Sequence, residues 1–169
     1  NRKIAEAEKG EMGVSFSSGM AAISSVSLTV LKPGDKVLIH ADTFARTLRF
    51  FKDFLGKFGV KTVVSPPGTE NIIEAMKSDK FNFVFIESIS NPLLRVIDIN
   101  EVSKVAKESG ALLVVDNTFA TPVNENPLTM GADIVVHSAS KFIAGHNDVI
   151  AGLAVGNKGL LEKVDMSRR

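Results

Sequence analysis

Segment 133–152, DIVVHSASKFIAGHNDVIAG, follows a short apolar run with Ser138, Ser140 and Lys141, three polar residues within four positions. Hydroxyl groups can bind a phosphate, and a lysine beside them can act as a nucleophilic amine. A cluster of this composition is also typical of a solvated loop. The segment alone therefore leaves two interpretations open, a phosphate site with a nucleophile at its end and an exposed turn.

A second stretch, FSSGMAAI, places Ser18, Gly19 and Met20 between a short apolar strand and a predicted helix. The first N–H groups of a helix have no partner within it, and the helix dipole adds up to about 2 kcal/mol in favour of an anion. Gly19 would let such a ligand approach the backbone closely. The alternative is that Ser18 is an ordinary helix cap. The stretch matches neither the P-loop pattern nor the glycine pattern of dinucleotide-binding proteins.

A third candidate, Asp116, ends the apolar run of LLVVDNTFATP, with no lysine or arginine close in sequence. A carboxylate at the end of a buried strand costs several kcal/mol unless a cation or hydrogen-bond donors meet it. Asp116 therefore indicates either a cap or turn residue or a partner for a cationic ligand atom. Lys141 poses the complementary problem, because a semi-buried amine is penalised for its charge and becomes a better nucleophile. The alternative is that Lys141, as a lysine after a strand, is an ordinary surface residue.

The composition is that of a globular protein, since the 169 residues are 44% hydrophobic and 23% charged. Lys and Arg number 20 and Asp and Glu 19, so the net charge of +1 argues against binding to nucleic acid or to an anionic membrane surface. No apolar run reaches the ~20 residues that span a bilayer. The lack of cysteine excludes disulfides and thiolate metal sites, and it fits a cytoplasmic enzyme.

One domain is expected over 1–169, because no linker or repeat interrupts the chain. The first residue is Asn1 and the last, Arg169, falls inside a predicted helix, so we expect a piece of a longer protein. His40, His137 and His146 show no metal-ligand spacing, and no metal site is predicted; His146 is interpreted as structural.

Short apolar runs alternate with helical segments, which predicts an α/β fold. Runs such as ALLVV and DIVV are apolar throughout, as in parallel strands covered on both faces, so we expect a mainly parallel sheet flanked by helices. One helix is expected from about 43 to 55, and two others begin at Thr69 and Asn100, the second ending at Gly110. The predicted strands are 36–40, 61–65, 81–87, 111–116, 133–137 and 149–155.

Ligands of open parallel sheets bind beyond the carboxyl ends of the strands, which is where these polar residues fall. The helix start, the carboxylate and the lysine together suit one ligand with a phosphate, a ring cation and a carbonyl group. Pyridoxal 5'-phosphate has all three. The other polar residues at predicted strand ends are Ser17, Asp42, Glu87, Ser88, Asn91, Asn117 and His137.

The motifs SSGMAAI, ESISNP, VVDNTFATP and GADIVVHSASKFIAGH, in this order, resemble those of the Cys/Met-metabolism family of pyridoxal-phosphate enzymes. That family includes cystathionine γ-synthase, cystathionine β- and γ-lyases and methionine γ-lyase. The resemblance implies that 1–169 is the central part of the large domain of a fold-type-I enzyme. It also implies that an N-terminal segment and a C-terminal domain of the parent enzyme are missing here.

The resemblance further implies roles for individual residues. Lys141 matches the lysine that holds the cofactor as a Schiff base, and Asp116 matches the carboxylate on the pyridine nitrogen. The expected cofactor-binding residues are Lys141, Asp116, Ser18, Gly19, Met20, Phe44, Asn91, Ser138 and Ser140, of which Gly19, Met20, Ser138 and Ser140 would hold the phosphate and Asn91 would lie near the phenolic oxygen of the ring.

The sequence departs from the family pattern most clearly at Phe44, where a tyrosine normally stacks on the ring and transfers a proton. Phe44 can stack, but it has no hydroxyl group, and such a proton transfer is typically worth 10²–10⁴-fold in rate. Arg46 stands where a glycine or small residue is usual. Milder departures are Ser140 for threonine, Ile89 for proline, Phe142 for tyrosine and Ala144 for glycine.

The implied activity is elimination at Cγ or Cβ of a sulfur amino acid, through a Lys141 Schiff base and a carbanion stabilised over Asp116. The alternatives are a γ-replacement synthase, which uses the same first steps, and a cofactor-binding module without catalysis. The expected partner is a small amino-acid substrate, and the full-length protein is expected to be a homo-oligomer, a tetramer built of dimers.

Overall fold

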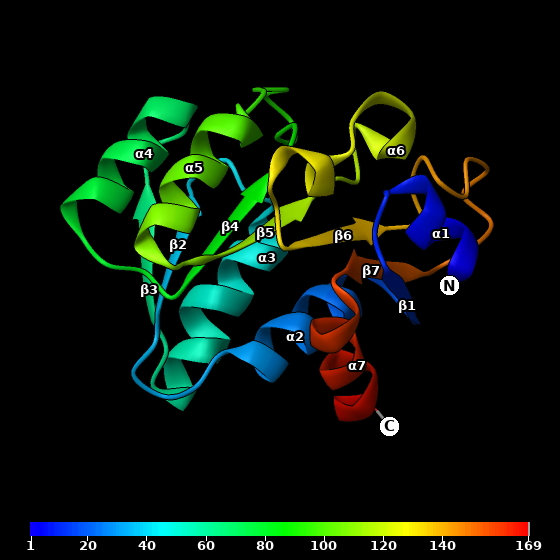
Figure 1. Cartoon of the computed structure of the whole chain (residues 1–169), viewed down its shortest axis with the longest axis horizontal. Coiled ribbons are helices and arrows are strands. Elements are labelled where there is room, and N and C mark those ends of the chain that lie inside the picture. Colours follow the sequence, from blue (N-terminus) through cyan, green and yellow to red (C-terminus); the bar gives the residue numbers. More distant parts are fainter. Residues whose placement is uncertain (169) are drawn as a thin grey trace.

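A computed structural model describes residues 1–168 as one seven-stranded sheet with helices on both faces (Figure 1). Strand β7 is antiparallel to both of its neighbours, β1 and β6, and all other pairs are parallel, so β7 alone runs against the rest. The predicted mainly parallel sheet is confirmed. In spatial order the strands are β1 (Met12–Phe16), β7 (Gly152–Gly156), β6 (Ile134–Ser138), β5 (Leu112–Asp116), β4 (Phe83–Glu87), β2 (Lys36–His40) and β3 (Lys61–Ser65).

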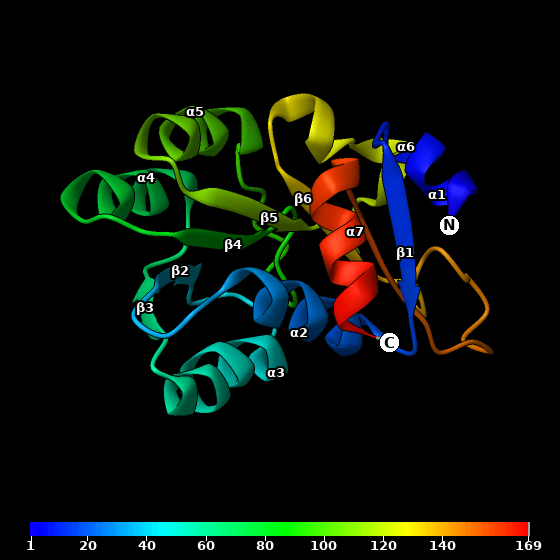
Figure 2. The ribbon, with the colours of Figure 1, turned by 60° about the horizontal axis from the view of Figure 1, so that its bottom comes forward.

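Two helical layers enclose the sheet, as Figure 2 shows. One layer contains α2 (Gly19–Val30), α3 (Ala45–Arg49) and α7 (Lys158–Ser167), and the other contains α4 (Thr69–Ser78) and α5 (Ile99–Ser109). The remaining short elements are α1 (Arg2–Ala7), the π-helical turn η1 (Phe50–Phe54), the 3-10 turns η2 (Leu55–Phe58) and η3 (Pro127–Met130), and α6 (Thr121–Asn124).

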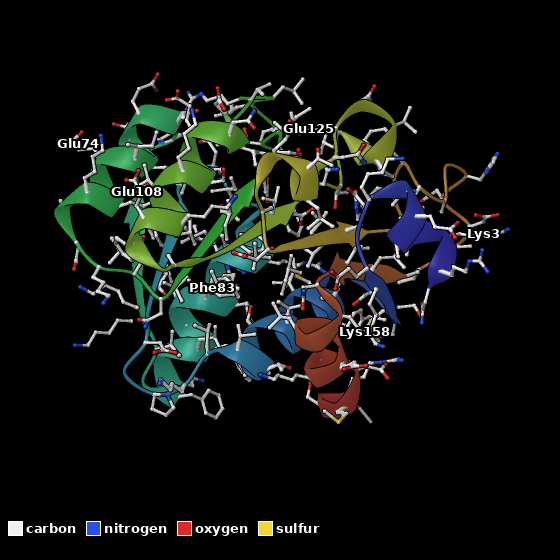
Figure 3. All side chains as sticks on the ribbon, viewed as in Figure 1. Lys3, Glu74, Phe83, Glu108, Glu125 and Lys158 are labelled. Atoms are coloured by element: carbon white, nitrogen blue, oxygen red, sulfur yellow. The ribbon has the colours of Figure 1, made fainter. Side chains whose placement is uncertain are left out.

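The apolar strands divide their side chains between two cores, because successive residues of a strand point to opposite faces. In β4, Phe83 and Phe85 pack into the core under α2 and α7, whereas Val84 and Ile86 pack into the core under α4 and α5. Phe83 lies in the interior and charged side chains such as Glu74 lie at the periphery (Figure 3). Burial on both faces explains why these strands read as continuous apolar runs.

The predicted strands 36–40 and 61–65 match β2 and β3 residue for residue, and the other strands are offset by one to three residues at one end or both. The largest error is 149–155, because Val149 and Ile150 are exposed loop residues and β7 begins at Gly152. The helix expected over 43–55 is instead the succession of α3, η1 and η2. Gly110 ends α5 in the left-handed region as expected, but Asp98, not Asn100, caps its start.

No helix within 1–168 is long and apolar enough to cross a membrane. The sheet arrangement instead gathers polar residues at one edge. Strands β1, β2, β4, β5 and β6 all end there, since they run in one direction.

Candidate active site

A cavity of about 460 Å³ opens at this edge of the sheet, where the carboxyl ends of β4, β5 and β6 meet the first turn of α2. Residues from segments far apart in sequence therefore line one space. Of the residues singled out from the sequence, those that line it are Gly19, Met20, Phe44, Asn91, Asp116, Ser138, Ser140 and Lys141.

Ser18 does not line the cavity. Its side chain accepts a hydrogen bond of 3.1 Å from the backbone N–H of Ala21, so Ser18 is the N-cap of α2. This cap leaves the N–H groups of Gly19 and Met20 without intrahelical partners at the cavity wall. In this structure the side chain of Ser18 is an ordinary helix cap, which was the alternative interpretation of the sequence.

Close packing holds the start of α2 against the sheet. A Cβ atom on Gly19 would lie 2.7 Å from Cβ of Ser138, and one on Gly152 would overlap the carbonyl group of Ser18 and lie 2.9 Å from the Gly19 nitrogen. Only glycine fits at either position without displacing a neighbour. The two glycines therefore place the first turn of α2 beside the end of β6.

Asp116 ends β5 and lines the cavity with a carboxyl group that no ion pair within 1–168 neutralises. The Thr118 hydroxyl and the Thr118 N–H, the latter at 3.0 Å, both donate to Oδ1. Burial raises the pKa of Asp116, and the Thr118 hydrogen bonds and the nearby His137 oppose the increase. A cationic ligand atom would favour the ionised carboxylate, which is the role the sequence suggested.

Thr118 is a site residue that sequence reasoning missed. Its hydroxyl donates to Asp116 and accepts the backbone N–H of Ser138 at 2.8 Å, so it connects the ends of β5 and β6. The sequence did contain an indication of this role. Thr118 follows Asp116 by two residues, a spacing at which side-chain and backbone groups commonly form hydrogen bonds.

Glu87 is the second residue that the sequence did not assign to the site. It ends β4 directly beside Asp116 in the strand register, lines the cavity and is 5% exposed. Its Oε1 accepts the backbone N–H of Phe44 at 2.7 Å. The run FVFIE places a carboxylate after an apolar strand in the same way as LLVVD, so a carboxylate at the end of a buried strand is as costly at Glu87 as at Asp116.

Lys141 departs from expectation in its burial. It lies in the turn after β6 and borders the cavity, but the residue is exposed. The interpretation of Lys141 as a semi-buried amine is therefore wrong, and the alternative of a surface lysine describes its exposure. The preceding Ser140 is anchored, since its hydroxyl accepts the N–H of Ala151 at 3.0 Å and donates to the carbonyl of Ala151 at 3.3 Å.

Phe44 and Asn91 approach the cavity from loops. Phe44 lies between β2 and α3 and is 44% exposed, which leaves its ring available to a planar ligand. Asn91, in the loop after β4, is also exposed and borders the same space. The chain contains no tyrosine, so no phenolic hydroxyl from these residues can replace the one that Phe44 lacks.

A fully buried polar network lies on the opposite face of the same strand ends. Ser88 donates to Asn117 at 2.9 Å, Asn117 donates to Glu8 at 3.1 Å, and Glu8 pairs with Nε2 of His137 at 2.6 Å. All four residues are inaccessible to solvent. Because strand residues alternate between faces, each strand end supplies one residue to the cavity and an adjacent one to this network.

The described part of the chain contains no group of three or more His, Cys, Asp or Glu side chains arranged to hold a metal ion. His146 is exposed, and its Nδ1 lies 3.1 Å from the carbonyl of Ala144 within its own turn.

The fold and the cavity define a class, the pyridoxal-phosphate enzymes of fold type I, in which a mainly parallel sheet presents its carboxyl edge to the cofactor. Residues 1–168 match the family model described as Cys/Met metabolism PLP-dependent enzyme, and the chain belongs to that family. The family resemblance expected from the motifs is therefore confirmed, and pyridoxal phosphate is the cofactor of the family.

The relatives that the chain matches are named for different activities. The chain is 40% identical over 162 residues to L-methionine gamma-lyase of Pseudomonas putida, covering 96% of this chain and 41% of the relative. It is 41% identical over 152 residues to a cystathionine gamma-synthase/O-acetylhomoserine (thiol)-lyase of Bacillus subtilis, covering 90% of this chain and 40% of that one.

A solved structure of cystathionine gamma synthase from Xanthomonas oryzae pv. oryzae, in complex with cystathionine, superposes with a TM-score of 0.92 at 37% identity. The match covers 98% of this chain and 43% of the solved one. The chain thus spans about two fifths of the length of the relatives it matches.

Proposed function

We propose that the protein catalyses pyridoxal-phosphate-dependent elimination at Cγ or Cβ of a sulfur amino acid. The observation that carries this proposal is the convergence of Asp116, Lys141 and the first turn of α2 on one cavity. The named relatives support the substrate class, because they include lyases and synthases of sulfur amino acids. The proposal concerns the whole protein, since the chain matches 41% of the methionine gamma-lyase.

The residues present fit the cofactor. The half-buried carboxyl group of Asp116 forms no ion pair within 1–168, and both Thr118 hydrogen bonds go to Oδ1, which leaves Oδ2 available to a protonated ring nitrogen. The N–H groups of Gly19 and Met20 suit an anion, and the absence of a side chain at Gly19 lets Ser138 lie directly against the start of α2.

The assignment of residues to the cofactor follows from this fit. Asp116 would hold the ring nitrogen, Lys141 the aldehyde carbon, the α2 start with Ser138 the phosphate, Phe44 one ring face and Asn91 the phenolic oxygen. Ser140 would contribute its hydroxyl only in competition with the backbone of Ala151, to which that hydroxyl is bonded here.

The chemistry divides between the cofactor and this chain. When bound, pyridoxal phosphate supplies an aldehyde for amines and a ring that withdraws electrons from the substrate Cα. Asp116 stabilises the proton on the ring nitrogen, and Lys141, as a free amine, takes the proton from Cα. Because Phe44 has no hydroxyl group and cannot transfer a proton, we infer that Lys141 also returns protons in later steps.

Replacement at Cγ is the second candidate function, and the synthase relatives favour it. Elimination and replacement share the first proton transfers, and they differ in whether water or a second amino acid or thiol ends the reaction. The residues that line the cavity are needed by both.

The test is a product assay with the full-length protein and methionine, cystathionine or homocysteine, each with and without an added thiol. Elimination yields 2-oxobutanoate or pyruvate with ammonia and thiol, whereas replacement yields a new thioether without ammonia. The matched control is Lys141→Arg, which keeps the positive charge but loses the free amine, and which we expect to form no product. Cofactor binding without any product from the wild type would identify a non-catalytic module.

Two expectations remain predictions. The proposed assembly is a homo-oligomer, a tetramer built of dimers, which the molar mass of the full-length protein in solution would test. The substrate is proposed only as a sulfur amino acid, and the assay above decides among the three candidates.

A further inference from the structure

Glu87 lies where the family motifs assigned no role, at the wall of the cofactor cavity. Its neighbours Phe83 and Phe85 point into the core under α2, and alternation along β4 places Glu87 on that same face. Asp116 is its register partner on β5 and lines the cavity with it. The two carboxyl groups are thus adjacent on one side of the sheet.

The side chain of Glu87 forms a hydrogen bond with the backbone of Phe44. Its Oε1 accepts the Phe44 N–H at 2.7 Å, across 43 positions of sequence. Phe44 is the residue before α3 and has no side-chain cap of its own. The carboxyl group of Glu87 therefore fixes the backbone from which the exposed Phe44 ring extends along the cavity.

The groups around Glu87 are mostly acidic or neutral. Burial, then Asp116 and Asp42, raise the pKa of Glu87 to about 8, against the opposing hydrogen bonds from Phe44 and Asn91. Asp42 is already paired with Arg95 at 3.0 Å.

His40 accepts the backbone N–H of Glu87 at 3.3 Å, and burial lowers the pKa of His40 to about 4, so this histidine is neutral near pH 7. The remaining charged group at the cavity is the exposed Lys141. No ion pair within 1–168 compensates Glu87, and its carboxyl group keeps a proton near neutral pH.

We propose that Glu87 is a positioning residue that holds Phe44 at the wall of the cofactor cavity, and that loss of the Glu87 proton displaces Phe44. Ionisation places a second negative charge beside Asp116, and repulsion between two adjacent carboxylates then moves Glu87 together with the backbone that it binds. This inference rests on the proposed function only for the identity of the ligand in the cavity. The contacts of Glu87 with Phe44 and its position beside Asp116 are formed within the chain without any ligand.

The first test introduces an indole at the site in the full-length protein, within a segment, residues 1–169, that has no tryptophan or tyrosine of its own. The emission of Phe44→Trp, minus that of the wild type, is followed from pH 6 to 9.5 without added cofactor. We expect a transition with a midpoint near pH 8 that is absent when Glu87→Gln is added, because glutamine has the same shape and cannot ionise. Phe58→Trp, at a 53% exposed position in η2, is the control for changes elsewhere.

The proposal would be overturned if Phe44→Trp showed the same transition with and without Glu87→Gln, or if the emission of Phe44→Trp did not change with pH.

A second measurement keeps Phe44 intact. The affinity of wild type and Glu87→Gln for pyridoxal phosphate is measured by absorbance over the same pH range, and the ratio of the two affinities cancels every pH effect that the two proteins share. We expect the wild type to weaken by threefold or more relative to Glu87→Gln between pH 7 and 9.

A constant ratio, or tighter binding by the wild type at pH 9, would contradict the positioning role. A wild type that binds no cofactor at any pH would instead refute the proposed function. In that case the fluorescence titration still decides the role of Glu87, since it requires no ligand.

Discussion

The contact between Gly152 and the start of α2 allows a sharp test of how the anion site is built. In Gly152→Ala the new methyl group would overlap the Ser18 carbonyl group and come within 2.9 Å of the Gly19 nitrogen, whereas 3.4–4 Å is ordinary contact. Gly152 is buried in β7 between Phe16 of β1 and Ser138 of β6, so the strand cannot retreat. The first turn of α2 must move instead, by at least about 0.5 Å at the Gly19 nitrogen.

Two losses follow from this displacement. Overpacking a well-packed core typically costs about 1–3 kcal/mol in the free energy of unfolding. The phosphate also loses favourable alignment with the N–H groups of α2, an interaction worth up to about 2 kcal/mol, which corresponds to roughly 30-fold in the dissociation constant.

The assay combines urea unfolding with a titration of pyridoxal phosphate by absorbance, on wild type, Gly152→Ala and Gly56→Ala. Gly56 is an exposed position in η2 where a methyl group would meet nothing within 4 Å, so this variant controls for the glycine-to-alanine change itself. We expect Gly56→Ala to be neutral or more stable by about 0.4–1 kcal/mol. Cofactor affinity in Gly152→Ala within about threefold of wild type would refute the reasoning, since about 0.7 kcal/mol is too little for a displaced anion site.

Four further predictions concern the site. Borohydride reduction of the cofactor-loaded protein and peptide mass mapping should find the pyridoxyl group on Lys141; its recovery on another lysine would contradict the assignment. Asp116→Ala should abolish turnover and weaken cofactor binding by about 1.5–3 kcal/mol, the strength of a charge-assisted hydrogen bond, and near-normal activity would exclude its role at the ring nitrogen. Phe44→Tyr should raise the elimination rate about tenfold or more, because proton transfer contributes 10²–10⁴-fold, and an unchanged rate would show that no hydroxyl is needed there. The pKa of Glu87 is raised from 4.5 to about 8, so the folded state binds more protons than the unfolded state between these values and stability falls as pH rises through them. Glu87→Gln removes this loss and should be more stable in urea by about 3 kcal/mol at pH 7, and identical pH slopes for the two proteins would argue against it.

Much of the fold could be predicted because both faces of the strands are buried. In β2, the buried apolar run 37–39 lies between Lys36 and His40, and these polar residues mark the limits of the strand. The reversed direction of β7 could not be predicted, because apolar composition is the same in parallel and antiparallel central strands. The start of β7 was predicted too early because Val149 and Ile150 are apolar, although both are exposed. Periodicity does not distinguish an apolar loop from an apolar strand.

The candidate site was predicted best where strand ends carry polar groups. Asp116 and Ser138 line the cavity because the carboxyl ends of neighbouring strands meet at one edge. The sequence could not decide between a semi-buried and a surface position for Lys141, because its exposure depends on the path of the turn after β6 and not on the strand before it. Glu87 was visible in the sequence, but its bond to Phe44 joins segments 43 positions apart and follows only from tertiary structure.

The alternation at the strand ends restricts how this protein can be altered. Glu87 and Ser88, or Asp116 and Asn117, are consecutive residues that serve opposite faces, the first facing the cavity and the second the buried network. Deleting one residue within β5 would shift the strand end by one position, bringing the Asn117 amide to the ligand and turning the Asp116 carboxyl group toward the buried face. Directed evolution of a new specificity should therefore succeed through substitutions and through length changes at the exposed residues 148–150, which do not line the cavity. Libraries with insertions or deletions in β4, β5 or β6 should yield no active variants.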